Sequence, residues 1–233
     1  MGRLATLLAL ISLLVAGCAT QPTLRPAPNA NLVADRPMGA RASAQDVEVV
    51  ARAGAWRWRP GQLDEFVTPM LVEIENNSDR TLRIRLSDFQ LMGPNGVELA
   101  ALPTYDITGE VRETVGSYVY SSSGFFIAPH YHPYYPRFSV WRGRFLYHPY
   151  YFETYYPIYR TYRVSLPTND MIVRALPEGT LRPGGTITGF IYFQHLDRQT
   201  ARRAAGLRLV FELVDAESMR EFGLIEIPFV VDR

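Results

Sequence analysis

Short runs in which apolar and polar residues alternate follow one another along the chain from about residue 45, and they predict β-strands. Met70, Val72 and Ile74 occupy every second position of one run, so a strand there turns all three side chains toward a core. Glu73 and Glu75 fall on the opposite, solvent face. Three more runs, residues 187–193, 207–214 and 225–231, are expected as core strands near the C-terminus, and the last two follow the same period of two. The pattern predicts an all-β sandwich.

Turn residues separate these runs. Asn76-Asn77-Ser78-Asp79 is a turn cluster, and we expect it to join the run ending at Glu75 to residues 82–86 as a β-hairpin. In that hairpin Glu73 and Glu75 share the solvent face with Arg83 and Arg85, which favours a structural role for these carboxylates over a catalytic one. Pro94-Asn95-Gly96 predicts a second tight turn.

One short helix is expected. Thr168-Asn169-Asp170 has the side chains of a helix N-cap, the residues from Met171 to Leu176 follow it, and Pro177 stops the helix.

The first seventeen residues predict an export signal. Arg3 precedes an apolar run from Leu4 to Val15, which is shorter than the roughly 20 residues that span a bilayer. The run ends in Leu14-Val15-Ala16-Gly17-Cys18, which resembles the bacterial lipobox, in which small residues precede a cysteine that receives lipid. The resemblance implies cleavage before Cys18, acylation of its thiol and three acyl chains, such as palmitate, on the mature cysteine.

An ordinary secretory signal cleaved after Ala19 is the alternative. The cysteine count favours the lipobox, because Cys18 is the only cysteine and a structural disulfide needs two. Because Ala19 rather than Asp follows Cys18, the sorting rule of Gram-negative lipoproteins implies the outer membrane if the source is Gram-negative. We therefore expect a lipid-anchored protein of the cell envelope.

The sequence predicts three parts. Residues 1–17 are the signal peptide, and residues 18–44 are the lipidated cysteine and a disordered tether rich in Pro, Ala, Asn and Arg. As a flexible coil this tether has a mean reach of roughly 30 Å. Residues 45–233 are the β-sandwich domain.

Charge says little about partners. The formal net charge is +1 and every Lys or Arg position is arginine. The interspersed signs give no large field, so neither nucleic-acid binding nor strong attraction to anionic surfaces is expected.

The β-rich part resembles the immunoglobulin-like, telokin-like domain of secreted and lipid-anchored bacterial proteins. The resemblance lies in Val72-Glu73-Ile74-Glu75-Asn76-Asn77-Ser78-Asp79, Ser87-Asp88-Phe89-Gln90-Leu91 with Gly96, Leu181-Arg182-Pro183-Gly184-Gly185, Gly189-Phe190-Ile191-Tyr192-Phe193 and Leu207-Arg208-Leu209-Val210-Phe211. It covers about residues 45–115 and 165–233. It implies a scaffold for interaction or accessory roles, without a shared catalytic constellation.

An aromatic insertion at about residues 117–163 departs from that resemblance. It holds 12 of the 14 tyrosines and three of the four histidines. Tyr131-His132-Pro133-Tyr134-Tyr135 recurs as Tyr147-His148-Pro149-Tyr150-Tyr151, and Phe138-Ser139-Val140-Trp141 lies between the copies. This insertion is the candidate for a functional segment.

Four interpretations of the insertion stay open. Exposed tyrosines beside arginines favour recognition of an envelope protein or a glycan, with His132, Tyr134, Tyr135, Trp141, His148, Tyr150 and Tyr151 as candidate binding residues. His130, His132 and His148 are weaker candidates for a copper or zinc site. The rings are also suited to a membrane interface, and a long aromatic loop without a specific ligand is the fourth interpretation.

No catalytic motif stands out. Cys18 is assigned to lipid, a Gly-x-Ser-x-Gly elbow and a Gly-rich phosphate loop are missing, and His195 is expected at a strand end in a structural role. Asp64-Glu65 is expected in a loop. We therefore expect neither an enzyme nor a cofactor.

Overall fold

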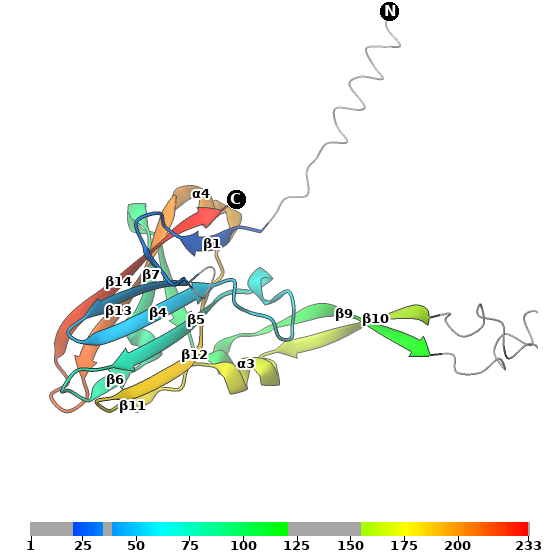
Figure 1. Ribbon diagram of the computed structural model, residues 1–233. Coiled ribbons are helices and arrows are strands. Elements are labelled where there is room, and N and C mark those ends of the chain that lie inside the picture. The colour runs from blue at the N-terminus through cyan, green and yellow to red at the C-terminus, as the bar shows by residue number, and fades with distance from the viewer. Residues whose placement is uncertain (1–20, 35–38, 121–154, 233) are drawn as a thin grey trace, which may run out of the picture. The chain divides into compact units, whose positions relative to one another are not determined.

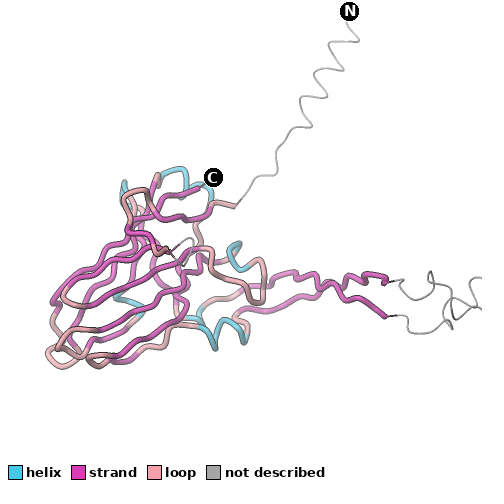
Figure 2. Tube along the Cα trace, viewed as in Figure 1, coloured by secondary structure: helices cyan, strands magenta, loops and turns pink. Residues whose placement is uncertain are grey.

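The computed structural model describes residues 21–34, 39–120 and 155–232, which form an all-β protein with two short α-helices (Figures 1 and 2). The predicted fold class is confirmed at the level of an all-β, sandwich-like protein. Contacts divide the chain between a larger unit, which contains the described residues up to Val111 and from Ser165, and a smaller unit, Arg112–Val164.

The larger unit is a set of antiparallel strands hydrogen-bonded in the order β1-β14-β13-β7-β8-β12-β5-β4-β3-β2. Strand β8 pairs with β7 on one side and with β12 on the other, so it joins the two faces of the sandwich. Strand β6 pairs with β13 and β11. The strands of this unit are β1 (Thr23–Pro26), β2 (Asn31–Leu32), β3 (Gly39–Ala44), β4 (Val47–Ala53), β5 (Val67–Asn76), β6 (Leu82–Ile84), β7 (Phe89–Met92), β8 (Glu98–Leu102), β11 (Gly179–Leu181), β12 (Gly185–Gln194), β13 (Gly206–Asp215) and β14 (Glu221–Asp232).

Helices of one or two turns connect some of these strands. Short 3-10 helices are η1 (Leu63–Glu65), η2 (Leu86–Asp88), η3 (Pro94–Gly96) and η4 (Thr104–Asp106), and the α-helices are α3 (Asn169–Arg174) and α4 (Arg198–Arg203).

The main hydrophobic core lies between the two faces, and the alternation in sequence predicts its members. Met70, Val72 and Ile74 are fully buried, and the side chains of Phe89 and Phe211 stack with ring centroids 4.1 Å apart. The three C-terminal runs form β12, β13 and β14 as predicted, with Leu207, Leu209, Phe211, Leu213, Ile225, Ile227 and Phe229 all buried.

A second hydrophobic cluster contains residues of β12 whose neighbours along the strand belong to the main core. Phe190 and Tyr192 pack in it with Trp56, whereas Ile191 and Phe193 belong to the main core. Every position of β12 from Gly189 to Phe193 is therefore buried, as expected for a strand covered on both faces.

The predicted helix forms as α3. The hydroxyl of its N-cap, Thr168, accepts a hydrogen bond from the Met171 amide at 3.4 Å. The helix ends at Arg174, and the amide of Leu176 instead donates to the Phe190 carbonyl at 2.8 Å. This bond ties the end of the helical segment to β12 before Pro177 is reached.

The prediction of a disordered tether over residues 18–44 is wrong for the described part of that segment. Strand β1 pairs with β14 from Thr23↔Asp232 to Pro26↔Phe229, and β3 pairs with β4 over its whole length. Leu24 and Ala40 are buried in the main core. The segment lacks strong periodicity because its strands are edge or near-edge strands with few large apolar residues, and main-chain pairing rather than side-chain pattern determines their structure.

The predicted hairpin between residues 70–75 and 82–86 is also wrong. Strand β5 pairs with β4 and β12, whereas β6 pairs with β11 and β13. The turn after Asn76 thus carries the chain from one face of the sandwich to the other. The Pro94-Asn95-Gly96 turn, by contrast, joins β7 to β8 as an antiparallel hairpin.

The sequence predicts one short helix, but the structure contains a second one, α4. The carboxylate of Asp197 caps α4 by accepting the Thr200 amide at 2.7 Å, and this backbone hydrogen bond lowers the pKa of Asp197. Ala201 and Ala204 are buried against the main core. Because only these two small side chains mark its inner face, the helix carries almost no apolar periodicity.

Two long strands, β9 (Gly109–Tyr120) and β10 (Tyr155–Leu166), pair with each other, and most of their residues belong to the smaller unit. The hydroxyls of Thr114 and Thr161 lie 3.2 Å apart across the pair. The pairing brings together the two ends of the insertion predicted at residues 117–163.

Candidate functional site

The residues selected from the sequence as candidate binding or lipidation sites lie outside the described residues. This applies to Cys18, His130, His132, Tyr134, Tyr135, Trp141, His148, Tyr150 and Tyr151. Their roles stay predictions. The structure shows that β9 and β10, on either side of these aromatic residues, are paired with each other.

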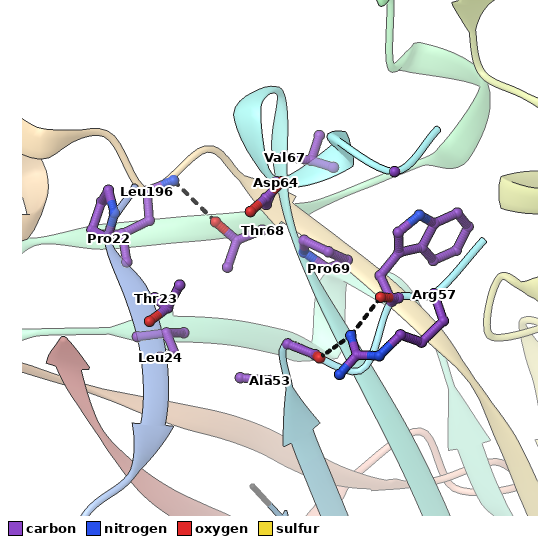
Figure 3. A pocket seen from close by; sticks show the side chains of 13 residues that line it. Pro22, Thr23, Leu24, Ala53, Arg57, Asp64, Val67, Thr68, Pro69 and Leu196 are labelled. Carbon is purple, nitrogen blue, oxygen red and sulfur yellow. Dashed lines mark hydrogen bonds between the residues drawn. The ribbon is translucent and has the colours of Figure 1, made fainter. Parts of the chain in front are cut away.

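A pocket of about 270 Å³ lies at one end of the larger unit (Figure 3). Sequence reasoning missed this pocket, because its walls come from four separate segments. It is lined by Pro22, Thr23, Leu24, Ala53, Gly54, Trp56, Arg57, Gly61, Asp64, Val67, Thr68, Pro69 and Leu196. The start of β1, the end of β4 with the loop that follows it, the start of β5 and Leu196, two residues after β12, meet here.

Hydrogen bonds to main-chain groups fix the polar side chains of Arg57 and Thr68 in the pocket. The Arg57 guanidinium donates to the carbonyls of Gly54 and Trp56, both at 2.7 Å (Figure 3). The Thr68 hydroxyl donates to the Gln194 carbonyl and accepts the Leu196 amide at 3.0 Å. Thr68 thereby fixes the chain after β12 against β5.

The carboxylate in the pocket belongs to Asp64, which the sequence placed in a loop with Glu65. Both residues belong to the 3-10 helix η1, whose Leu63 is fully buried. Asp64 and Glu65 are exposed. An exposed carboxylate lacks the apolar enclosure that adapts a carboxyl group to acid–base catalysis.

An aromatic cluster extends from the wall of the pocket. Trp56, which lines the pocket, packs edge-on against Phe190, with ring centroids 5.1 Å apart, and against Trp58 at 5.6 Å. Its indole nitrogen donates to the Pro60 carbonyl at 2.8 Å. The guanidinium carbon of Arg174 lies 3.9 Å from the centroid of Trp58, within the range of a cation–π interaction. The cluster joins the loop after β4 to β12 and α3.

Tyr192 is the polar member of this cluster. Its side chain is 1% exposed, and its hydroxyl donates to the Met171 carbonyl at 3.0 Å. Burial raises the pKa of Tyr192 well above its usual value, the Arg174 charge lowers it by a smaller amount, and Asp170 adds to the increase. The phenol therefore acts as a neutral hydrogen-bond donor that ties β12 to α3.

His195 directly follows β12, at the strand end where the sequence places it. Its Nδ1 is buried and has no hydrogen-bond partner among the described residues. Within the described ranges, no group of three or more His, Cys, Asp and Glu residues is arranged to hold a metal ion. The histidines of the insertion lie outside these ranges, so the metal interpretation stays a prediction.

None of the helices in the described part of the chain is long and apolar enough to cross a membrane.

Comparison with known proteins found no matching family model, no similar curated protein and no similar solved structure.

Proposed function

We propose that the chain is an exported bacterial lipoprotein that acts as a non-enzymatic binding or structural module of the cell envelope. Cys18 carries the lipid, and the protein is held in the outer membrane if the source is Gram-negative. The larger unit is an immunoglobulin-like scaffold, and the aromatic insertion recognises an envelope protein or a glycan.

The observation that carries the recognition proposal is the concentration of the tyrosines in a segment whose two ends are joined by paired strands. Of the 14 tyrosines, 12 lie between residues 117 and 163, and β9 pairs with β10 at the two ends of this segment. Tyrosine offers a large contact area at a low cost in conformational entropy, and neighbouring arginines add directional donors. A tyrosine-rich segment between two paired strands therefore suits recognition of a partner.

The lipid anchor is supported by the pattern around Cys18. The short apolar run after Arg3 ends in Ala16-Gly17, and the only cysteine of the chain follows immediately. This combination is typical of a lipoprotein signal. Mass spectrometry of the mature protein tests this part directly, because acylation adds the mass of the lipid to the peptide that begins at Cys18.

The recognition proposal is tested with purified protein, isolated peptidoglycan as the glycan probe and a detergent extract of envelope proteins as the protein probe. Replacing Tyr134, Tyr135, Tyr150 and Tyr151 with Ser is expected to abolish capture of the bound probe and to leave the thermal midpoint of unfolding within a few degrees. Tyr105→Ser is the matched control, because Tyr105 is 73% exposed and lies outside the insertion. Unchanged capture by the fourfold variant contradicts recognition through these tyrosines.

A further inference from the structure

The first strand begins close to the predicted lipidation site. Only Ala19 to Pro22 separate Cys18 from Thr23, where β1 begins. Five Cα-to-Cα steps at the limit of an extended chain span at most about 18 Å. The coil of residues 18–44 expected from the sequence has a longer mean reach, of roughly 30 Å. The anchor and the folded unit are thus much closer than the sequence indicates.

Strand β1 is attached to the fold by pairing and burial. It pairs with β14 along its four residues, Leu24 is 3% exposed within the main core, and Arg25 forms an ion pair with Asp232. Its first residue cannot move away from the sandwich without breaking these contacts. The end of the larger unit that contains Thr23 is therefore the end that a lipid on Cys18 holds at the membrane.

Helix α4 lies at this same end. Leu196, two residues before α4, lines the pocket together with Pro22 and Thr23 (Figure 3). After α4, the Ala205 carbonyl accepts the amide of Val231, whose partner in β1 is Leu24. Contacts on both sides of the helix thus place it beside the start of β1 (Figure 1).

The outer surface of α4 is basic. Ala201 and Ala204 face the core, whereas Arg198, Arg202 and Arg203 are exposed. The Asp197 carboxylate is engaged by the Thr200 amide. Arginine binds phosphate through a planar fork of donors, and phospholipid headgroups present phosphate at the membrane surface.

We propose that α4 docks on the phosphate layer of the membrane beside the lipid anchor, so that the pocket end of the sandwich faces the membrane and the opposite end faces away. This inference rests on the proposed acylation of Cys18 and adds an orientation and a contact surface to it. The partner is the phospholipid headgroup, bound through Arg202 and Arg203. Each arginine near an anionic surface favours the docked state by about 1 kcal/mol, a factor of about five.

The experiment uses the mature acylated protein in vesicles of phosphatidylethanolamine with 30% phosphatidylglycerol. Acylation blocks the thiol of Cys18, so a cysteine introduced by Gln199→Cys in α4 or by Asp79→Cys takes a single fluorophore. Asp79 follows the far end of β5, and the ten residues of β5 from Val67 to Asn76 span about 30 Å. Lipids with a nitroxide on the headgroup then report which label lies at the membrane.

We expect the label at position 199 to be quenched at least threefold more strongly than the label at position 79. Adding Arg202→Gln and Arg203→Gln is expected to reduce the ratio of docked to undocked protein about 25-fold. Arg85→Gln with Arg182→Gln is the matched control, because both arginines are exposed and neither belongs to α4; it is expected to leave quenching unchanged.

The outcomes separate the two proposals. An acylated protein whose two labels are quenched equally, or whose α4 variant behaves like the control, overturns the docking of α4 and leaves the lipoprotein assignment intact. A mature protein without acyl mass on Cys18 overturns the assignment, and the inferred orientation with it.

Discussion

At the scale of single residues, Tyr192 shows how one polar atom is kept in a hydrophobic cluster. Its ring packs with Trp56, with centroids 6.1 Å apart, and its hydroxyl bonds to Met171 of α3. The charged phenolate loses both solvation and this hydrogen bond when buried, so the folded state retains the proton. The contribution of Tyr192 to the free energy of unfolding therefore depends on pH in the alkaline range.

We predict that Tyr192→Phe lowers the free energy of unfolding by about 1 kcal/mol at pH 8, because one buried hydrogen bond is lost. Since the folded pKa of Tyr192 is raised, the stability that its neutral phenol provides is present below the unfolded pKa of about 10. That stability declines as the pH rises above this value, by up to about 1.4 kcal/mol per pH unit. The difference in the free energy of unfolding between the wild type and Tyr192→Phe should therefore become smaller as the pH rises above about 10.

Urea unfolding at pH 8, 9, 10 and 11 measures this gap. Tyr105→Phe is the exposed control, and it should differ little from the wild type at any of these values. A gap for Tyr192→Phe that stays constant from pH 8 to 11 would contradict a raised pKa in the folded state.

Asn76 shows what the sequence does and does not reveal about a single position. A turn after residue 75 is predictable from the Asn-Asn-Ser-Asp cluster. The burial of Asn76 is not predictable, because its amide donates to the Arg80 carbonyl at 2.8 Å and to the Leu181 carbonyl at 2.9 Å. The second partner lies 105 residues away in the sequence. A long-range hydrogen bond of this kind leaves no local signal.

At the scale of elements, period-two strands were predictable and their partners were not. The runs that form β5, β13 and β14 show alternation because one of their faces is in the core, whereas β12 is a short apolar run that is covered on both faces. Nothing in β5 or β6 specifies that they lie in different faces of the sandwich, since a turn cluster suits a hairpin and a crossing equally well. The ion pair of Arg83 with Asp88, at 2.7 Å, replaces the expected cross-strand pairs.

Strand β1 gives the sharpest test at this scale. We predict that Leu24→Ala lowers the free energy of unfolding by about 2–5 kcal/mol, because it leaves a cavity in the main core. Leu32→Ala is the matched control, since Leu32 is 63% exposed in β2, and its effect is expected to be within about 0.5 kcal/mol. Urea unfolding followed by tryptophan fluorescence provides both values.

Equal stability of the Leu24→Ala and wild-type proteins would mean that β1 is not part of the core. It would also restore the flexible tether predicted from the sequence and remove the short spacing between Cys18 and the fold. This substitution therefore tests the structural premise of the membrane orientation separately from the lipid on Cys18.

At the scale of the whole molecule, the chain combines a scaffold with an inserted segment. The composition of the insertion was visible in the sequence because tyrosine and histidine are concentrated there. The pocket was not visible, because Pro22, Arg57, Thr68 and Leu196 come together only through the pairing of β1, β5 and β12 with their neighbours. Sequence patterns thus located the unusual segment, whereas the fold alone reveals the site that depends on distant residues.

The separation of the two units predicts that the scaffold folds without the insertion. Replacing Ser117–Arg163 with a short Gly-Ser linker is expected to leave a single cooperative unfolding transition. The free energy of unfolding should be unchanged or higher by about 1 kcal/mol, because a shorter loop loses less entropy on closure. The replacement removes Trp141, so fluorescence then reports on Trp56 and Trp58 in the cluster beside β12. A loss of several kcal/mol would instead show that residues of the insertion belong to the core, and the tyrosines would then be structural rather than a surface for recognition.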